Sequence, residues 1–476
     1  MMPTLIGMVA AAIGLLLLVR GSVPTMFGFL NLLSLMGGSA AVVLTALGGS
    51  SVPPVELGLG FAALRILLPG SRQGAAFAEA VRANALLVGF AVVGVLLAFV
   101  GPRLFAGQIQ IVPMKLSVMD SLFMTAPLKP TSQNITTAIY LLGTLLAALI
   151  AHVAMRDPRA PDSFVKTGVV IGWIHVVTGL FGAVVRGTPA SIAIDMFRNG
   201  NYAQTDQFYG NFARISGIMP EPSSYALFAF AWFVFLTECW WRDVLPRRTG
   251  PIALALLIVL AASTSSTAYA GLAGYGAIML ARMVLFPGGL RMSKMAAIGV
   301  LTLTLVAICA ALLAFRPMLL DLTQAMIADM TVNKQGSESG LQRVFWARKG
   351  IEAFVASGGL GIGPGSFRSS SIVTAIIGST GVVGSSLFLL YLVKTLRPLR
   401  RSTYVPTGDT AQSIGAAASW AAIGMIIPAA AMAASPDPGV TFAVFAGSAI
   451  GLRARQPRSA RARSISARNG AVAALG

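Results

Sequence analysis

The chain has few ionisable side chains for its length. Only 11% of its 476 residues are charged, whereas 56% are apolar and the mean hydropathy is +0.78. Soluble globular domains average about 25% charged residues. This composition excludes a soluble globular protein. It predicts a chain that crosses a membrane several times, since one helical span needs about 20 mostly apolar residues.

Cysteine and histidine are almost absent. Cys239 and Cys309 lie in apolar segments, which excludes a disulfide framework. His152 and His175 lie inside predicted spans and have no Cys, Asp or Glu at ligand spacing, so we expect no metal site. We interpret both histidines as core residues bonded to backbone carbonyls; a catalytic role is the alternative.

Acidic residues are also scarce, with 16 Asp and Glu against 35 Lys and Arg and a formal net charge of +19. In a membrane protein, basic residues gather in the cytoplasmic loops. The charge therefore needs no nucleic-acid partner. We expect it to set the topology and to contact lipid headgroups; contact of the basic C-terminal tail with RNA is the alternative.

Apolar runs recur from one end of the chain to the other. They predict a single transmembrane domain over 1–476, an all-α polytopic fold with about 12–13 spans. The runs lie near 4–19, 26–48, 52–69, 83–105, 133–155, 164–186, 222–241, 250–264, 267–286, 295–315, 371–396, 411–433 and 438–453.

Basic residues crowd into alternate loops and into a tail over 453–476. This pattern predicts a cytoplasmic C-terminus, and an outer N-terminus if every run spans. Three segments then face outward, 106–132, 187–221 and 316–370. The last is long enough to be functional, and its parts 321–330 and 339–355 are typical of helices. A transporter would typically show two related halves with helices broken by Gly or Pro, and we find no such pair in the sequence.

The stretch from Asn211 to Ala226 places an arginine and a Pro-Glu-Pro-Ser sequence at the outer mouth of a span. Arg214 can bind a phosphate bidentately. Glu221, between two prolines, is placed to accept a proton from a hydroxyl as a general base. The alternatives for Glu221 are a plain helix N-terminal charge and an ion pair with Arg214.

Other basic residues depart from the positive-inside pattern and also face outward. Arginines clustered there could hold a pyrophosphate whose lipid tail stays in the bilayer. Ordinary ion pairing is the alternative, as for Arg348 and Glu352 at helical spacing. The basic residues are Arg186, Arg198, Arg214, Arg316, Lys334, Arg343, Arg348, Lys349 and Arg368.

A glycine-rich segment runs from Gly358 to Arg368. Such a backbone can turn amides toward a phosphate; a tight approach to the span at 371–396 is the alternative. The Ser-Thr-Ser-Ser-Thr run at 263–267 predicts a polar turn between two short apolar runs, and we interpret that turn as structural.

Taken in order, these segments resemble the O-antigen ligase/polysaccharide polymerase superfamily, in particular the Wzy-type polymerases of exopolysaccharide synthesis. The similar pieces are 214–225, 263–267, 339–346 and 359–368. The resemblance implies a GT-C-like fold in the bacterial inner membrane, with a large periplasmic loop over the site. It also implies a glycosyltransferase that needs no metal or other cofactor and whose donor is an oligosaccharide on undecaprenyl pyrophosphate.

The resemblance implies that Arg214 and Arg343 hold the pyrophosphate, and we add Glu221 to them as catalytic candidates. We expect the substrate to be bound by Arg186, Arg316, Arg348, Arg368, Ser223, Tyr225, Gly363 and Gly365. Ligases of this superfamily carry a histidine soon after the glycine-rich piece, whereas this chain has Ser369-Ser-Ser.

That departure favours a polymerase, which joins the glycan to another lipid-linked repeat unit. The alternatives are a ligase that transfers the glycan to a lipid acceptor and, in another class, a flippase of lipid-linked oligosaccharide. We also expect contacts with membrane lipids and with other proteins of polysaccharide assembly and export.

Overall fold

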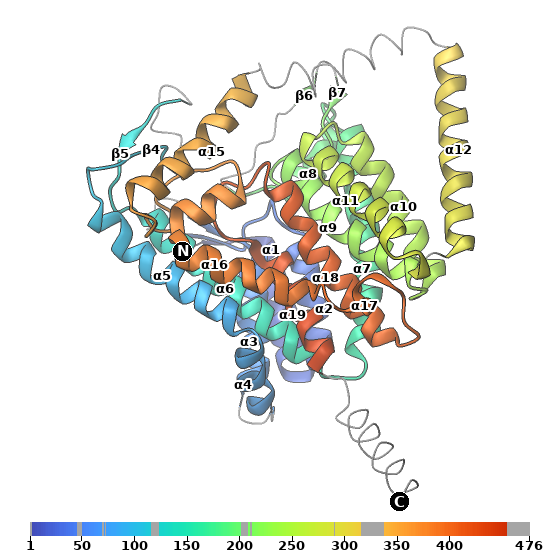
Figure 1. Ribbon diagram of the computed structural model, residues 1–476, viewed down its shortest axis with the longest axis horizontal. Helices are drawn as coiled ribbons and strands as arrows, with labels where there is room; N and C mark the ends of the chain where they lie inside the picture. Colours follow the sequence, from blue (N-terminus) through green and yellow to red (C-terminus); the bar gives the residue numbers. More distant parts are fainter. Residues whose placement is uncertain are drawn as a thin grey trace, which may run out of the picture.

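The computed structural model describes residues 2–44, 50–68, 71, 73–115, 123–200, 208–209, 212–289, 291–315 and 338–454. Over these residues the chain is mostly helical, and each predicted apolar run contains a helix (Figure 1). The helices in these runs are α1 (Leu5–Arg20), α2 (Val23–Ser34), α3 (Pro54–Leu67), α5 (Ala85–Leu104), α6 (Ser132–Ala154), α7 (Ala160–Val184), α9 (Pro222–Trp241), α10 (Pro246–Ala262), α11 (Ser266–Leu285), α12 (Met292–Phe315), α16 (Ile372–Leu396), α18 (Thr410–Ala429) and α19 (Gly439–Ala454).

Seven of these helices are long and apolar enough to cross a membrane: α5, α6, α7, α9, α11, α16 and α18. The protein is therefore a multi-pass membrane protein with a helical fold. Shorter elements lie in the connections: α4 (Gly74–Ala83), η4 (Pro189–Ser191), α8 (Ile192–Asp195), η5 (Pro287–Gly289), α15 (Glu338–Ala356) and α17 (Arg401–Tyr404).

The strands are two or three residues long and pair only antiparallel. They are β1 (Met2–Pro3), β2 (Val42–Leu44) and β3 (Ser50–Val52) in one sheet, β4 (Gln110–Ile111) with β5 (Ala126–Pro127), and β6 (Phe208–Tyr209) with β7 (Phe212–Ala213).

One predicted span was wrong in its second half. The run near 26–48 does not continue as a helix, because α2 ends at Ser34 and the chain turns at Gly37–Gly38 before it enters β2. The Gly38 amide donates to the Ile218 carbonyl oxygen at 3.1 Å, and a side chain at Gly38 would collide with that backbone. The turn therefore brings the chain against the segment that precedes α9.

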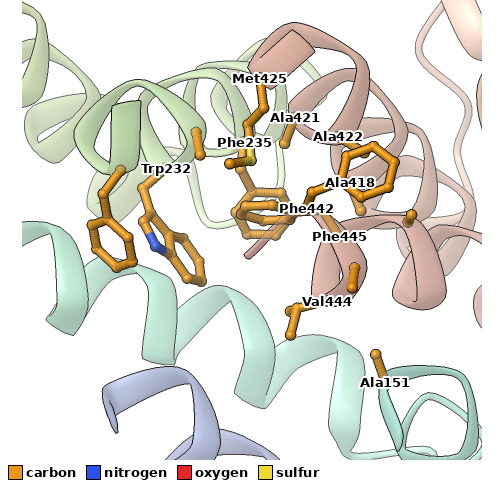
Figure 2. Close-up of a cluster of buried hydrophobic side chains, with 14 of the residues drawn as sticks. Ala151, Trp232, Phe235, Ala418, Ala421, Ala422, Met425, Phe442, Val444 and Phe445 are labelled. Carbon is orange, nitrogen blue, oxygen red and sulfur yellow. The ribbon is translucent and has the colours of Figure 1, made fainter. Parts of the chain in front are cut away.

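Helix α9 lies at the centre of the bundle and is buried on nearly every side. Figure 2 shows Trp232 and Phe235 of α9 beside Phe442 and Phe445 of α19, with alanines of α18 above them. The Trp232 and Phe445 rings lie 4.9 Å apart, edge to face, a favourable arrangement of aromatic rings. The alanines let the helices approach closely, as small residues do in membrane proteins.

The two ends of the bundle differ in character. At one, the loop end, the segments 35–41, 105–115, 123–131, 185–200, 212–221, 263–265, 338–371 and 430–438 come together. At the other, the basic end, Glu79 pairs with Arg156, and Asp243 with Arg291 and Lys294. In Figure 1, α15 lies at the loop end and α4 at the basic end. The alternation read from the charges therefore matches the alternation of helix ends.

Candidate anion-binding site at the loop end

The candidate site is built around the turn between α10 and α11, Ser263–Ser265. Thr264 has a φ of +48°, a conformation that costs a non-glycine residue energy. This conformation turns the Thr264 carbonyl toward Arg214, whose Nη2 donates to it at 3.2 Å. A strained residue next to a cation is typical of a functional position.

Arg343, on α15, contacts the first residue of α11, directly after this turn. Its Nη1 donates to the Ser266 hydroxyl at 3.5 Å and to the Ala431 carbonyl at 3.4 Å. Burial lowers the pKa of Arg214, and the positive charge of Arg343 lowers it further. Two guanidinium groups thus lie close together in partly desolvated surroundings, where an anion between them would be stabilised.

Glu221 is the N-cap residue of α9 and lies beside this pair. Its Oε1 accepts hydrogen bonds from the hydroxyls of Ser223 and Ser224, the latter at 3.3 Å. Its negative charge raises the pKa of both Arg214 and Arg368, which shows that it lies near each of them. The carboxylate is therefore held at the N-terminus of α9, near two cations.

Arg368 closes another side of the cluster. Its guanidinium lies over the Trp346 ring, 4.8 Å from the ring centroid, and its backbone amide donates to the Val112 carbonyl at 2.8 Å. Burial lowers the pKa of Arg368, and the charge of Glu221 opposes that shift. A cation–π contact with tryptophan orients the guanidinium while leaving its edge available to a ligand.

Arg198, predicted only as one of the outward basic residues and not as a site residue, is a further cation at this place. Its side chain is 5% exposed, and its Nη2 donates to the Pro220 carbonyl at 3.3 Å. Arg198, Arg214, Arg343 and Arg368 thus gather around Glu221. A cluster of arginines favours an anionic ligand.

Several buried donors beside the cluster have no hydrogen-bond partner among the described residues. They are the Thr264 hydroxyl, the Gln342 amide nitrogen and the Arg368 Nε. Buried donors are normally paired, and each exception needs an explanation. A bound ligand with several acceptor oxygens, such as a pyrophosphate, would explain all three.

The remaining predicted site residues lie in different places. Ser223 belongs to the cluster through Glu221, and Arg186 follows α7 at the loop end. Arg316 and the helix predicted over 321–330 lie outside the described residues. Arg348 is on α15, the helix predicted over 339–355, and its side chain is 77% exposed and paired with Glu352 at 3.0 Å. The ion pair proposed for Arg348 as the alternative is therefore present.

Tyr225 supports the fold beneath the site. Its side chain is fully buried, its hydroxyl donates to the His175 carbonyl at 2.9 Å, and its ring stacks on the His175 imidazole at 3.9 Å. The His175 Nε2 lies 3.2 Å from the Tyr225 carbonyl, which confirms the core role predicted for this histidine. A contact between Tyr225 and substrate stays a prediction.

The glycine-rich segment packs against transmembrane backbone. The Ile362 and Gly363 amides donate to the Gly378 and Ser379 carbonyls of α16 at 2.9 Å, beside a break in that helix at Gly381. Gly363 and Gly365 have φ of +92° and +80° and approach the backbone of α5 and α6. This is the tight approach to the span, and binding of substrate by either glycine stays a prediction.

Serine and threonine hydroxyls follow the glycine-rich segment. The Ser369 and Thr374 hydroxyls are 2.8 Å apart, and the Ser370 hydroxyl donates to the Arg343 carbonyl at 2.5 Å. Both serines are buried, so they fix α15 and Arg343 relative to the start of α16. Within the described ranges, no group of three or more His, Cys, Asp or Glu side chains could hold a metal ion.

Comparison of the chain with protein-family models finds none that matches, and comparison with curated proteins finds no match either. The arginine cluster and the residues that hold it are therefore the features of this membrane protein that bear on its function.

Proposed function

We propose that this protein is a polysaccharide polymerase of the GT-C-like, Wzy-type class. It transfers a glycan from undecaprenyl pyrophosphate to a lipid-linked repeat unit at the outer face of the bacterial inner membrane. The observation that supports this proposal best is the meeting of Arg214 and Arg343 at one turn, beside Glu221. Arg214 and Glu221 come from one segment of the sequence, whereas Arg343 comes from another.

The proposed reaction breaks the bond between the anomeric carbon and the pyrophosphate oxygen. A hydroxyl of the acceptor sugar attacks that carbon and forms the new glycosidic bond, while Glu221 takes up the hydroxyl proton and passes it to water. The leaving pyrophosphate gains negative charge. Arg214 and Arg343 stabilise that charge without a general acid, because fixed charges act strongly in a partly desolvated site.

The position of the cluster suits a donor that stays in the membrane. The arginines lie at the ends of α9, α11 and α16, where a headgroup can reach them while its lipid tail remains among the hydrocarbon chains. The positive-inside rule assigns the basic end to the cytoplasm, which makes the loop end periplasmic and the C-terminus cytoplasmic. Membrane lipids and other proteins of polysaccharide assembly and export are the expected partners.

A reconstituted assay tests the function directly. Purified protein in proteoliposomes receives lipid-linked repeat units on the side of the loop end, and the products are separated by size. A polymerase gives a ladder of lengths. A single transfer to a different lipid would indicate a ligase, movement of unchanged donor across the bilayer would indicate a flippase, and either result would overturn the proposal.

A further inference from the structure

A cavity lined by arginines lies at the basic end, at the opposite end of the bundle from the arginine cluster. It has a volume of about 50 Å³, several times the space that admits one water molecule. It opens between the end of α16, the start of α18 and the last turn of α19. The lining residues are Arg397, Arg400, Ser402, Thr403, Ala411, Gln412, Gly415, Ala416, Leu452 and Arg453.

Arg453 forms the rigid wall of this cavity. Its Nη1 donates to the Lys394 carbonyl at 2.9 Å, and its Nη2 donates to the Thr395 carbonyl and the Ser419 hydroxyl, each at 2.5 Å. These bonds tie α19 to the end of α16 and to α18. The guanidinium is thus fixed in place before any ligand arrives, which reduces the entropy that binding would cost.

Arg397 and Arg400 form the opposite, exposed side. Arg397 caps α16 with a φ of +52°, again an unfavourable value for a residue with a side chain. Partial burial lowers the pKa of Arg397, and the positive charge of Arg400 lowers it further. Arg453 also feels the charge of Arg397, so the three cations act on one another.

The lining set contains no carboxylate to balance these charges. The acidic residue nearest in sequence, Asp409, has another role: its Oδ1 accepts from the amides of Ala411 and Gln412 and caps α18. The remaining polar lining residues are Ser402, Thr403 and Gln412. The Thr403 hydroxyl donates to the Leu396 and Arg397 carbonyls, each at 3.1 Å, so the side chains of Ser402 and Gln412 are the neutral donors that face a ligand. Three arginines and two neutral donors form an arrangement that suits a tetrahedral anion.

We propose that this cavity binds a phosphate group with an uncompensated negative charge, either the headgroup of an anionic phospholipid or free phosphate. The cavity lies at the end of the bundle where basic residues accumulate and where basic pockets between helices commonly hold lipid headgroups. The bound phosphate neutralises Arg397 and Arg400 and joins the end of α16 to α18 and α19. It therefore stabilises the folded protein.

The test measures thermal unfolding of the full-length protein in nanodiscs. One arm compares phosphatidylglycerol with phosphatidylcholine; the other adds inorganic phosphate to phosphatidylcholine nanodiscs, with sodium chloride at equal ionic strength as reference. We expect phosphatidylglycerol, phosphate or both to raise the unfolding temperature. A shift with phosphatidylglycerol alone identifies a lipid headgroup, and a shift with inorganic phosphate identifies the free anion. No shift in either arm overturns the proposal.

The variants distinguish a site from general attraction. R397Q/R400Q removes both exposed cations and leaves Arg453 to its structural bonds; we expect it to abolish the shift and to weaken binding by about tenfold or more per arginine. R401Q removes an exposed neighbour that does not line the cavity and should keep the full shift. A specific site would be contradicted if R401Q lost as much of the rise in unfolding temperature as R397Q/R400Q does. It would also be contradicted if R397Q/R400Q kept the full rise. R400Q alone, at an exposed side chain, serves if the double variant does not fold.

Discussion

Arg214 and Arg343 both donate hydrogen bonds where α10 turns into α11: Arg214 to the Thr264 carbonyl and Arg343 to the Ser266 hydroxyl. They come from segments more than a hundred residues apart, before α9 and on α15. The turn itself joins α10 to α11. A shift of either arginine would therefore change the position of the other relative to Glu221.

Arg214→Ala is expected to abolish polymer while leaving the protein in the membrane. It removes a cation that the partly desolvated site keeps next to Arg343. Arg214→Lys should restore only part of the yield, because lysine lacks the bidentate fork. Polymer length and yield in the reconstituted assay are the measurements. Arg103→Ala, at an exposed arginine of the same end of the bundle, is the matched control and should retain full yield. Normal polymer from Arg214→Ala would remove the donor-binding role.

Arg343→Ala should have the same effect through α15. The arginine contacts Ser266 and Ala431, so its loss frees α15 from α11 and from the segment after α18. We expect donor binding to weaken along with turnover, by about 10-fold or more for a lost charge-assisted contact. Binding of labelled donor to the purified variant checks this. Donor affinity equal to that of the wild type would show that Arg343 serves only to dock α15.

Glu221→Gln should keep the fold and the donor affinity but lose turnover. The amide oxygen of glutamine can still accept the bonds from Ser223 and Ser224, so the start of α9 is preserved. It cannot accept a proton as a base does, and loss of a general base commonly reduces rate by about 10²–10⁴-fold. Single-turnover rates at saturating donor separate binding from chemistry. Ser224→Ala, which removes one of those bonds and leaves the carboxylate, should retain most of the rate. Full turnover in Glu221→Gln would reduce the residue to a helix cap.

Asp437→Asn should stabilise the protein at neutral pH. Burial raises the pKa of Asp437 from 3.8 to about 6, although the Thr144 hydroxyl at 2.7 Å and the Gly439 amide at 3.2 Å act against the rise. A carboxyl group whose pKa is higher in the folded state than in the unfolded state binds its proton more tightly in the folded state. It therefore favours folding most when it is protonated. The free energy of unfolding should therefore fall as pH rises from about 4 to 6 and stay low above that.

The full effect of Asp437 on the free energy of unfolding is at most about 3 kcal/mol, since each pKa unit corresponds to about 1.4 kcal/mol. Glu56 lies near Asp437, and the substitution would also remove the repulsion between these two carboxylates. Urea unfolding as a function of pH measures the slope, which should be smaller in Asp437→Asn. Asp409→Asn, at an exposed helix cap, is the comparison. An unchanged slope would show that Asp437 does not titrate in this range.

Glu238→Ala should strongly destabilise the basic end. The carboxylate has no exposed surface and bonds to Arg242 at 3.3 Å, to Tyr275 at 2.9 Å and to Arg282. Removal of one member of a buried ionic group leaves the others uncompensated, at a cost of about 3–5 kcal/mol. Thermal unfolding in detergent should show a large decrease. Glu79→Ala, which breaks a half-exposed pair with Arg156, should cost about 1 kcal/mol or less. Similar losses in the two variants would contradict a buried network.

The sequence allowed the helices to be located but not the partners of the site residues. Apolar runs and basic loops are local patterns, so they located a helix in every predicted run. The contact of Arg214 with Thr264 joins residues fifty positions apart, and only the packing of α9 against α10 and α11 brings them together. Arg198 stands in the sequence as one of several outward basic residues, and Trp346 as one residue of the piece 339–346. No local signal shows that either of them belongs to the arginine cluster, because their places depend on packing between distant segments.

The break of α16 at Gly381 has a consequence for motion. Gly381 has φ +62° and ψ −160°, and the Gly359 carbonyl accepts from the Val382 amide beyond it while the Gly378 and Ser379 carbonyls accept from the loop. Loop and helix thus share one hydrogen-bond ladder. Their amides should exchange with solvent together, as a single cooperative unit. The glycine-rich segment is then held rigidly to α16, and we expect the two to move as one body.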